Sequence, residues 1–304
     1  MTPIRVFVPA SIGNVGPGFD VLGLAVDGLG DEIEIEKSGS DIEIVDITGR
    51  DAADIPREAE KNTASIAAAA WMRKAGYRDG LKIKIHRRLP VSGGLGASAT
   101  SAVGGAFATA ALYGQESDRQ SIMEAALTAE EQVAGRHLDN IAPSLFGGLT
   151  ISFSTEPAKV VPVQMTGNWW LVTVTPDLRV NTKDSREVLP GQLSTQNWVK
   201  QMAHTSSLIV AFQSGDQETM RLALVDPFAE VYRSALIPGF FSVKKSAIAA
   251  GALGCSISGG GPTIFSICAN EQSAHEIGEA MRSGFQCEAQ VHVGQVAKKG
   301  AMII

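Results

Sequence analysis

Alternating apolar and polar residues predict β-strands in the first third of the chain. The pattern occurs in IRVFVPA (4–10), in DEIEIEKSGSDIEIVDI (31–47) and in LKIKIHRRLP (81–90). A period of two places successive side chains on opposite faces of a sheet, and the charged residues in these runs leave one face in water. Antiparallel sheets commonly have one solvated face, so we expect antiparallel strands here.

Helices are predicted between and after these strands. Residues 60–76 include a capping residue, Asn62 or Thr63, carry basic residues in their last turn and stop at Gly76. Residues 97–113 and 118–135 are also expected to form helices, the second from the helical spacing of its apolar positions. In the second half we expect strands at 169–176 and 287–293, helices at 197–215, 240–254 and 271–283, and two strands hinged at glycines over 255–269.

These elements predict an α+β fold of two domains. Strands and helices interleave, but the alternating strands are too polar for an all-parallel doubly wound sheet. A Pro-bearing stretch at 154–168 lies between two strand signals, which is typical of a domain junction. We therefore expect domains at residues 1–158 and 159–304.

Composition excludes several classes of partner. The net charge of the 304 residues is −6, and no basic tract indicates a nucleic acid or an anionic membrane as partner. Cys255, Cys268 and Cys287 lack the spacing of a zinc site or a disulfide framework, so we expect buried thiols. We find no secretory leader and no apolar run of the roughly 18 residues that a membrane span needs, and we expect a cytoplasmic protein.

The segment PVSGGLGASATSA (90–102) has the features of a phosphate-binding loop. Glycine lets an anion approach unpaired backbone N–H groups at a helix start, and a hydroxyl there can bind phosphate or its magnesium ion. Tight packing of a Gly/Ala-rich helix on a sheet is the structural alternative. GxxxxGK[ST] is absent, and although Gly94, Gly96 and Ala99 fit GxGxxA, the flanking elements do not fit a dinucleotide fold.

This segment resembles the central motif of the GHMP kinases, P-x-x-x-G-L-G-S-S-A, which wraps the phosphates of ATP. Ala97 replaces the first serine of that motif, and Ser98 retains the second. The resemblance implies an N-terminal ATP-binding domain with a mixed or antiparallel sheet and helices, and a C-terminal ferredoxin-like α/β sandwich. Four further segments resemble those of the homoserine kinases within this family, namely PASIGNVGPGFDVLGLA (9–25), RHLDNIAPSLFGG (136–148), NTKDSREVLP (181–190) and GCSISGGGPTIFSI (254–267).

The resemblance implies ATP-dependent phosphorylation of the L-homoserine hydroxyl to O-phospho-L-homoserine for threonine biosynthesis, with Mg²⁺, in a homodimer. It assigns Mg²⁺ to Ser98 and Glu130, with Glu131 as the alternative acid. It places Asn62 against adenine, although Asn62 could equally be a helix cap. The implied ATP-binding residues are Asn62, Pro90, Val91, Ser92, Gly93, Gly94, Leu95, Gly96, Ala97, Ser98 and Ala99.

By the same resemblance, Asp20 binds the substrate ammonium and Asn14 its hydroxyl or amine. The alternative is that both are turn residues that bond local backbone. A carboxylate calls for the forked donors of arginine, which the resemblance assigns to Arg186 and Arg233, although Arg233 follows Glu-Val where relatives have Glu-Pro. Thr182, His137 and Asn140 complete the implied substrate site.

The implied catalytic residues are His137, Asn140 and Arg186. Asn140 stands where several other GHMP kinases carry an aspartate base, and an amide cannot accept the hydroxyl proton as a carboxylate does. Asp139 is adjacent, but neighbouring residues face different directions and the resemblance gives it no such role. We therefore expect catalysis mainly by positioning.

Three other functions remain open from the sequence. A GHMP kinase for mevalonate or a sugar would not need two carboxylate-binding arginines. A non-catalytic sensor that binds ATP and a small ligand is compatible with Ala97, whereas Ser98 and Glu130 favour activity. A dehydrogenase is the weakest alternative.

Overall fold

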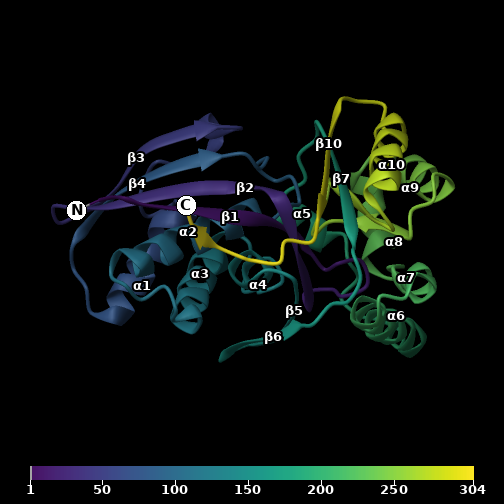
Figure 1. The fold of residues 1–304 in the computed structure, drawn as a ribbon, viewed down its shortest axis with the longest axis horizontal. Helices are drawn as coiled ribbons and strands as arrows, with labels where there is room; N and C mark the ends of the chain where they lie inside the picture. The colour runs from purple at the N-terminus through teal and green to yellow at the C-terminus, as the bar shows by residue number, and fades with distance from the viewer. Residues whose placement is uncertain (1) are drawn as a thin grey trace.

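Two β-sheets organise the computed structural model, which describes residues 2–304 (Figure 1). The larger sheet has seven strands: five lie in the order β11-β1-β2-β4-β3, and β5 pairs with β2 and β6. Its paired strands are antiparallel except β3 and β4, which run parallel. The bounds are β1 (Ile4–Gly13), β2 (Leu22–Ser38), β3 (Ile42–Gly49), β4 (Gly80–Arg87), β5 (Leu149–Thr155), β6 (Ala158–Val163) and β11 (Met302–Ile303).

Helices of the first half pack against this sheet and against each other (Figure 1). α1 begins where the sequence predicts, because Asn62 Oδ1 accepts a hydrogen bond of 3.0 Å from the Ala64 N–H. Gly105 in α2 contacts the α1 backbone so closely that a Cβ atom there would clash with Ala64 O. These elements are η1 (Ala52–Asp54), α1 (Thr63–Ala75), α2 (Ala97–Leu112), α3 (Arg119–Val133) and α4 (Ile141–Phe146).

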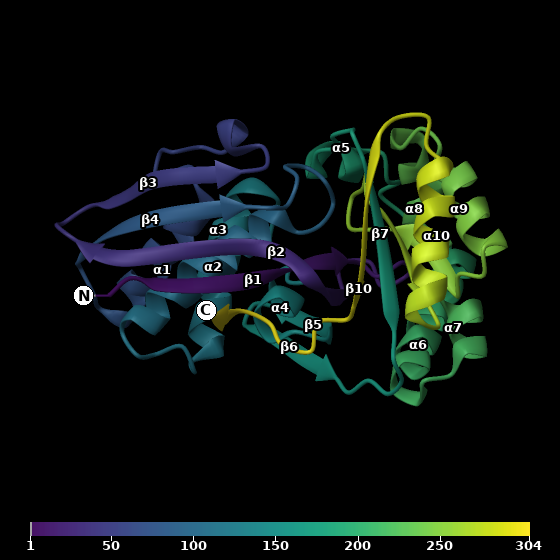
Figure 2. The same cartoon turned by 45° about the horizontal axis from the view of Figure 1, so that its top comes forward.

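The smaller sheet is antiparallel, in the order β10-β7-β9-β8. α9 and α10 cover one of its faces (Figure 2), with Val243, Ile277 and Met281 in the shared core. The elements of this half are β7 (Trp170–Pro176), α5 (Thr182–Glu187), α6 (Thr195–Ser214), α7 (Gln217–Ala223), α8 (Ala229–Arg233), η2 (Ser234–Leu236), α9 (Phe240–Ala249), β8 (Gly254–Ile257), β9 (Ile264–Cys268), α10 (Glu271–Ser283) and β10 (Ala289–Gln295).

A shared hydrophobic core joins the two halves of the molecule. Ile12 and Leu24 from the larger sheet lie in one buried cluster with Phe212 and Phe265 from the second half. The larger sheet also takes up β6, which spans the predicted boundary at 158/159, and the C-terminal strand β11 beside β1 (Figure 1). The division at that boundary stays a prediction.

The mixed α+β fold is as the sequence predicts, and two local expectations are wrong. β3 pairs in parallel with β4, because the chain passes through α1 between them. Cys287 is exposed, whereas Cys255 and Cys268 are buried, and all three thiols are free. Within residues 2–304, no helix is both long and apolar enough to cross a membrane.

Candidate active site

A buried ion pair holds both ends of the glycine-rich loop that connects β4 to α2. Arg87 Nη1 donates to Asp31 Oδ2 at 2.8 Å and to the carbonyl of Ala97 at 2.6 Å. Asp31 Oδ1 accepts from the backbone N–H groups of Arg88 and Leu89 at 2.8 and 3.1 Å. The loop between residues 89 and 97 is therefore anchored at each end by one buried ion pair.

The loop itself requires glycine. Gly94 and Gly96 have φ angles of +81° and +70°, a region that residues with a Cβ rarely adopt. A Cβ at Gly94 would lie 2.6 Å from the carbonyl of Gly261, and one at Gly96 would clash with Ser11 Oγ. The backbone at Gly94 and Gly96 therefore packs directly against Gly261 and Ser11, with no space for a side chain.

The N–H groups of the loop are available to a ligand. Within residues 2–304, no N–H group of residues 92–96 donates a hydrogen bond to the protein. The N–H groups of residues 97–99 belong to the first turn of α2, where an α-helix has no internal acceptors. Ser92, Gly94 and residues 96–98 are half-buried, so solvent reaches this loop. Such a row of free amides at a helix start favours an anion.

Glu130 lies beside Ser98 with an unpaired carboxylate oxygen. The residue is 6% exposed, and its Oε1 has no hydrogen-bond partner within residues 2–304. Burial raises the pKa of Glu130 to about 7; the nearby Ser98 hydroxyl opposes that shift, and Asp139 adds to it. A buried oxygen without a partner beside a hydroxyl fits one side of a Mg²⁺ site.

Glu131, the alternative metal ligand, points elsewhere. Its side chain is exposed and accepts a hydrogen bond of 2.7 Å from Arg136 Nη1. In residues 2–304, no three or more His, Cys, Asp or Glu side chains are grouped so as to hold a metal ion. The geometry therefore favours Glu130 over Glu131 as the acid beside Ser98.

Asp20 and Arg186 bind each other. Arg186 Nη1 and Nη2 donate to the two oxygens of Asp20 at 3.1 and 2.7 Å. His137 Nδ1 lies 3.6 Å from Asp20 Oδ2, and burial lowers the pKa of this histidine. The structure thus brings three of the predicted substrate residues together, from β1–β2, the loop before α4, and α5.

Arg233 is a buried cation that has no carboxylate partner among residues 2–304. Its residue is 3% exposed, and Nε and Nη1 donate to the carbonyls of Ser185 and Gly259, both at 2.9 Å. Burial is the main cause that lowers the pKa of Arg233, and the nearby charge of Arg186 lowers it further. Both arginines lie near Phe19, whose ring centre is 5.6 Å from Arg186 Cζ and 5.2 Å from Arg233 Cζ. A buried guanidinium that only carbonyls satisfy favours an added anion.

The backbone of this region is strained. Asn14, Val15 and Asp20 have positive φ angles of 65°, 47° and 54°. Asn14 Oδ1 accepts from the Asp20 N–H at 2.9 Å, and its Nδ2 donates to the carbonyl of Gly259 at 2.9 Å. The bond to Asp20 is that of a turn residue, whereas the bond to Gly259 reaches the second half of the chain. Strain of this kind concentrates at functional sites.

Asp139 and Asn140 approach the same point of β1. A Cβ atom at Gly13 would lie 2.5 Å from Asp139 Oδ2 and 2.7 Å from Asn140 Nδ2. The expectation that their side chains diverge is therefore wrong, because the turn before α4 presents both to the glycine. Asn140 also contacts the glycine-rich loop, since a Cβ at Gly96 would lie 2.9 Å from its Oδ1.

For four other predicted site residues, the side chain has a structural role or makes no hydrogen bond to the rest of the candidate site in the described part of the chain. Asn62 is 2% exposed and uses its side chain to cap α1 and to donate to the Pro56 carbonyl at 2.7 Å. Thr182 is exposed at the start of α5, and in residues 2–304 no side-chain hydrogen bond joins it to the others. Leu95 and Ala99 direct their side chains into the hydrophobic core, so only their backbone can meet a nucleotide.

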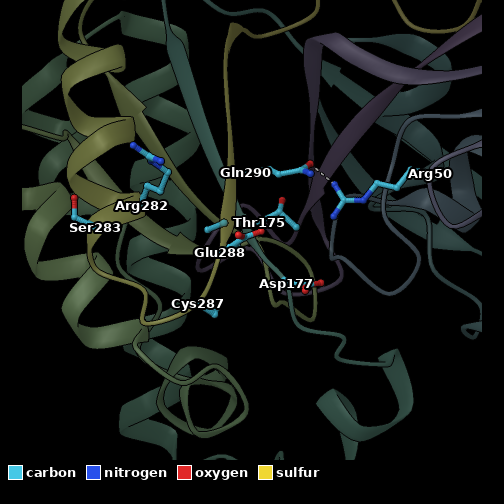
Figure 3. Close-up of a pocket in the computed structure, with 9 residues that line it drawn as sticks. Arg50, Thr175, Asp177, Arg282, Ser283, Cys287, Glu288 and Gln290 are labelled. Atoms are coloured by element: carbon cyan, nitrogen blue, oxygen red, sulfur yellow. Dashed lines mark hydrogen bonds between the residues drawn. The ribbon is translucent and has the colours of Figure 1, made fainter.

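A cavity of about 680 Å³ lies beside β7, β10 and α10 (Figure 3). Arg50, Thr175 and Glu288 are among its lining residues. None of the predicted site residues lines it.

Comparison with known proteins decides the family. The models of the GHMP kinase N-terminal and C-terminal domains match residues 62–148 and 208–287. A homoserine kinase of Pyrococcus abyssi is 38% identical over 93% of this chain and 92% of its own, and one of Arabidopsis thaliana is 37% identical over 93% and 78%. The chain belongs to the homoserine kinase family.

The fold agrees with this membership. The crystal structure of homoserine kinase from Cytophaga hutchinsonii superposes with a TM-score of 0.96 at 38% identity, over 100% of this chain and 98% of that one. The two-domain GHMP kinase architecture predicted from the motifs is therefore confirmed.

Sequence reasoning missed Phe19 and the buried position of Asp139. Phe19 stands in the segment 9–25 that resembles the family's first motif, so that motif was the available signal. The direction of Asp139 carries no local signal, because it depends on how the turn before α4 packs against Gly13 and Gly23.

Proposed function

We propose that this protein transfers the γ-phosphoryl group of ATP to the side-chain hydroxyl of L-homoserine, giving O-phospho-L-homoserine for threonine biosynthesis. The observation that carries the proposal is the buried Arg233, which has no carboxylate partner in the described part of the chain and lies close to the paired Asp20 and Arg186. A zwitterionic amino acid supplies the missing carboxylate to the arginines and an ammonium to Asp20.

The triphosphate would lie on the free N–H groups of residues 92–98. Asn140 contacts Gly96 of this loop and accepts a hydrogen bond of 3.0 Å from Ser11 Oγ. Its amide is thus held between the proposed phosphate site and β1, where it can orient the substrate hydroxyl. This contact supports an arrangement in which acceptor and phosphoryl group meet at Asn140.

Ser98 and Glu130 would hold Mg²⁺, supported by the unpaired Oε1 of Glu130. When bound, Mg²⁺ offsets the charge that develops on the transferred phosphoryl group. Binding requires a deprotonated Glu130, and its pKa of about 7 places that ionisation near neutrality.

Positioning carries most of the proposed acceleration. Orientation of two bound reactants can supply roughly 7–11 kcal/mol. A loose transition state for phosphoryl transfer needs little prior deprotonation of the attacking hydroxyl. His137 and Arg186 would act by fixing the substrate, and Thr182 would join them once the substrate is bound.

We further propose a cytoplasmic homodimer. Exposed apolar residues on α6, namely Trp198, Val199 and Met202, support a surface that a second copy covers. Light scattering coupled to size-exclusion chromatography tests the oligomeric state.

Product identification tests the proposed reaction. The protein is incubated with Mg-ATP and L-homoserine, and ³¹P NMR follows the mixture. We expect a phosphate-monoester signal on the homoserine side chain together with ADP. Formation of ADP and inorganic phosphate alone would indicate an ATPase and contradict the proposal.

A further inference from the structure

In the proposed phosphate loop (residues 92–98), the carbonyl groups of residues 92–95 accept hydrogen bonds on the side away from the free amides. Four consecutive carbonyls accept hydrogen bonds, and three of them receive donors from the second half of the chain. These bonds are Val180 N to Ser92 O (3.3 Å), Thr263 N and Oγ1 to Gly93 O (3.2 and 2.6 Å), Ser258 Oγ to Gly94 O (2.6 Å) and Ser11 N to Leu95 O (3.2 Å).

These bonds determine where the free N–H groups point. A trans peptide unit is planar, so the carbonyl of one residue and the N–H of the next point in opposite directions. Fixing the carbonyls of residues 92–95 therefore fixes the N–H groups of residues 93–96 on the other side. These are N–H groups without an acceptor within residues 2–304.

Two of the donors are side-chain hydroxyls at the glycine turn between β8 and β9. Ser258 and Thr263 are both fully buried, and the Thr263 hydroxyl also shares a bond of 2.7 Å with Thr175. We propose that Ser258 and Thr263 are positioning residues for the nucleotide, because their hydroxyls turn the amides of the phosphate loop toward the triphosphate. The proposal rests on ATP binding at this loop.

The same turn touches the proposed homoserine site through its backbone. The Gly259 carbonyl accepts from Asn14 Nδ2 and Arg233 Nη1, both at 2.9 Å, and its N–H donates to the Gly13 carbonyl at 3.0 Å. Loss of the Ser258 or Thr263 hydroxyl leaves these backbone groups in place. The two hydroxyls should therefore affect the nucleotide and leave homoserine binding intact.

The test substitutes Ser258→Ala and Thr263→Val and measures MgADP binding by calorimetry and steady-state kinetics with ATP and homoserine. Each lost hydrogen bond should raise the Kd for MgADP and the KM for ATP about three- to tenfold. The KM for homoserine should stay within about twofold of wild type. Thr263→Ser retains the hydroxyl and should keep the wild-type affinity for MgADP.

Two buried hydroxyls that do not touch the loop provide matched controls. Thr173 on β7 is 1% exposed and its Oγ1 has no partner within residues 2–304, so Thr173→Val is the isosteric control for Thr263→Val. Ser266 on β9 is buried and donates to Met281 Sδ, so Ser266→Ala controls for Ser258→Ala. Both controls should bind MgADP as the wild type does.

An unchanged Kd for MgADP in Ser258→Ala and Thr263→Val, with only a lower melting temperature, would overturn the proposal. So would an equal loss of affinity in Thr173→Val. If Thr263→Val does not fold, Ser258→Ala decides the question alone. A wild-type protein that binds MgADP but does not phosphorylate homoserine refutes the proposed function and leaves this inference standing.

Discussion

Arg186 donates from both terminal nitrogens to the two oxygens of Asp20, at 3.1 and 2.7 Å. The two residues are the proposed partners of the substrate carboxylate and ammonium, and without substrate they neutralise each other. A zwitterion can replace this pair by two new ion pairs, whereas a ligand with one charge leaves either Asp20 or Arg186 without a partner. The proposed site should therefore favour an amino acid over a ligand with one charge.

Arg186→Ala should raise the KM for homoserine by about 100-fold, because a desolvated carboxylate loses paired donors that contribute about 1.5–3 kcal/mol. The KM for homoserine of Arg186→Lys should lie between those of the wild type and Arg186→Ala, since lysine keeps the charge but cannot form two parallel bonds to a carboxylate. The KM for ATP serves as the internal control and should not change. An unchanged KM for homoserine in Arg186→Ala would remove this residue from the substrate site.

Glu130→Gln should stabilise the ligand-free protein at pH 8 and inactivate it. The pKa of Glu130 is raised from 4.5 to about 7 in the folded state, so its stabilising contribution is complete below about pH 4.5 and is lost as the pH rises through 7. Above that pH the fold contains a buried charge, and removing it should add on the order of 1–3 kcal/mol. Thermal unfolding at pH 5 and pH 8 measures the difference.

Glu131→Gln is the control for this substitution, because Glu131 is exposed. Its melting temperature should change little at either pH, and it should retain Mg²⁺-dependent activity. If Glu131→Gln loses activity and Glu130→Gln keeps it, the metal ligand is the exposed acid.

Asp139→Asn tests whether a base takes the hydroxyl proton. Burial raises the pKa of Asp139 to about 7, with a further contribution from Asp20, and Oδ2 accepts from the Asn14 N–H at 3.2 Å. An asparagine can accept the same bond, so catalysis by positioning predicts a kcat within about threefold of wild type. A loss of about 10²–10⁴ in kcat with a flattened pH profile would instead make Asp139 the general base.

Gly96→Ala should cost both stability and activity. The substitution forces a Cβ into a residue with φ of +70° and against Ser11 Oγ. We expect a destabilisation of about 1–3 kcal/mol and a kcat/KM for ATP reduced well beyond that of Gly114→Ala. Gly114 is a fair comparison, since its φ is also positive but nothing lies within 4 Å of an added Cβ. Equal effects of Gly96→Ala and Gly114→Ala on stability and on kcat/KM for ATP would contradict a role of Gly96 in binding ATP.

Local chemistry made part of the fold predictable. The cap at Asn62, the stop at Gly76 and the glycine-rich loop before α2 depend on neighbouring residues, and the structure has each where the sequence indicates. The start of β2 at Leu22 was missed because its first five residues are buried on both faces, so no alternation is visible. Helices α4, α5, α7 and α8, of five to seven residues, are too short to establish a period.

The site depends on contacts that the sequence cannot reveal. Ser258 and Gly94 are 164 residues apart, and Arg186 and Asp20 are 166 apart. Motif resemblance named most of the participating residues, but their partners follow from the packing of the two halves. The exposed Cys287 and the convergence of Asp139 with Asn140 are consequences of the same packing.

The most direct measurement is a coupled ADP-release assay that compares kcat/KM for L-homoserine, L-serine, L-threonine and mevalonate at fixed Mg-ATP. Homoserine should be preferred, because it alone combines both charges with a hydroxyl one carbon further from them than in serine. Release of ADP at the same rate without homoserine, or a preference for mevalonate, would contradict the account.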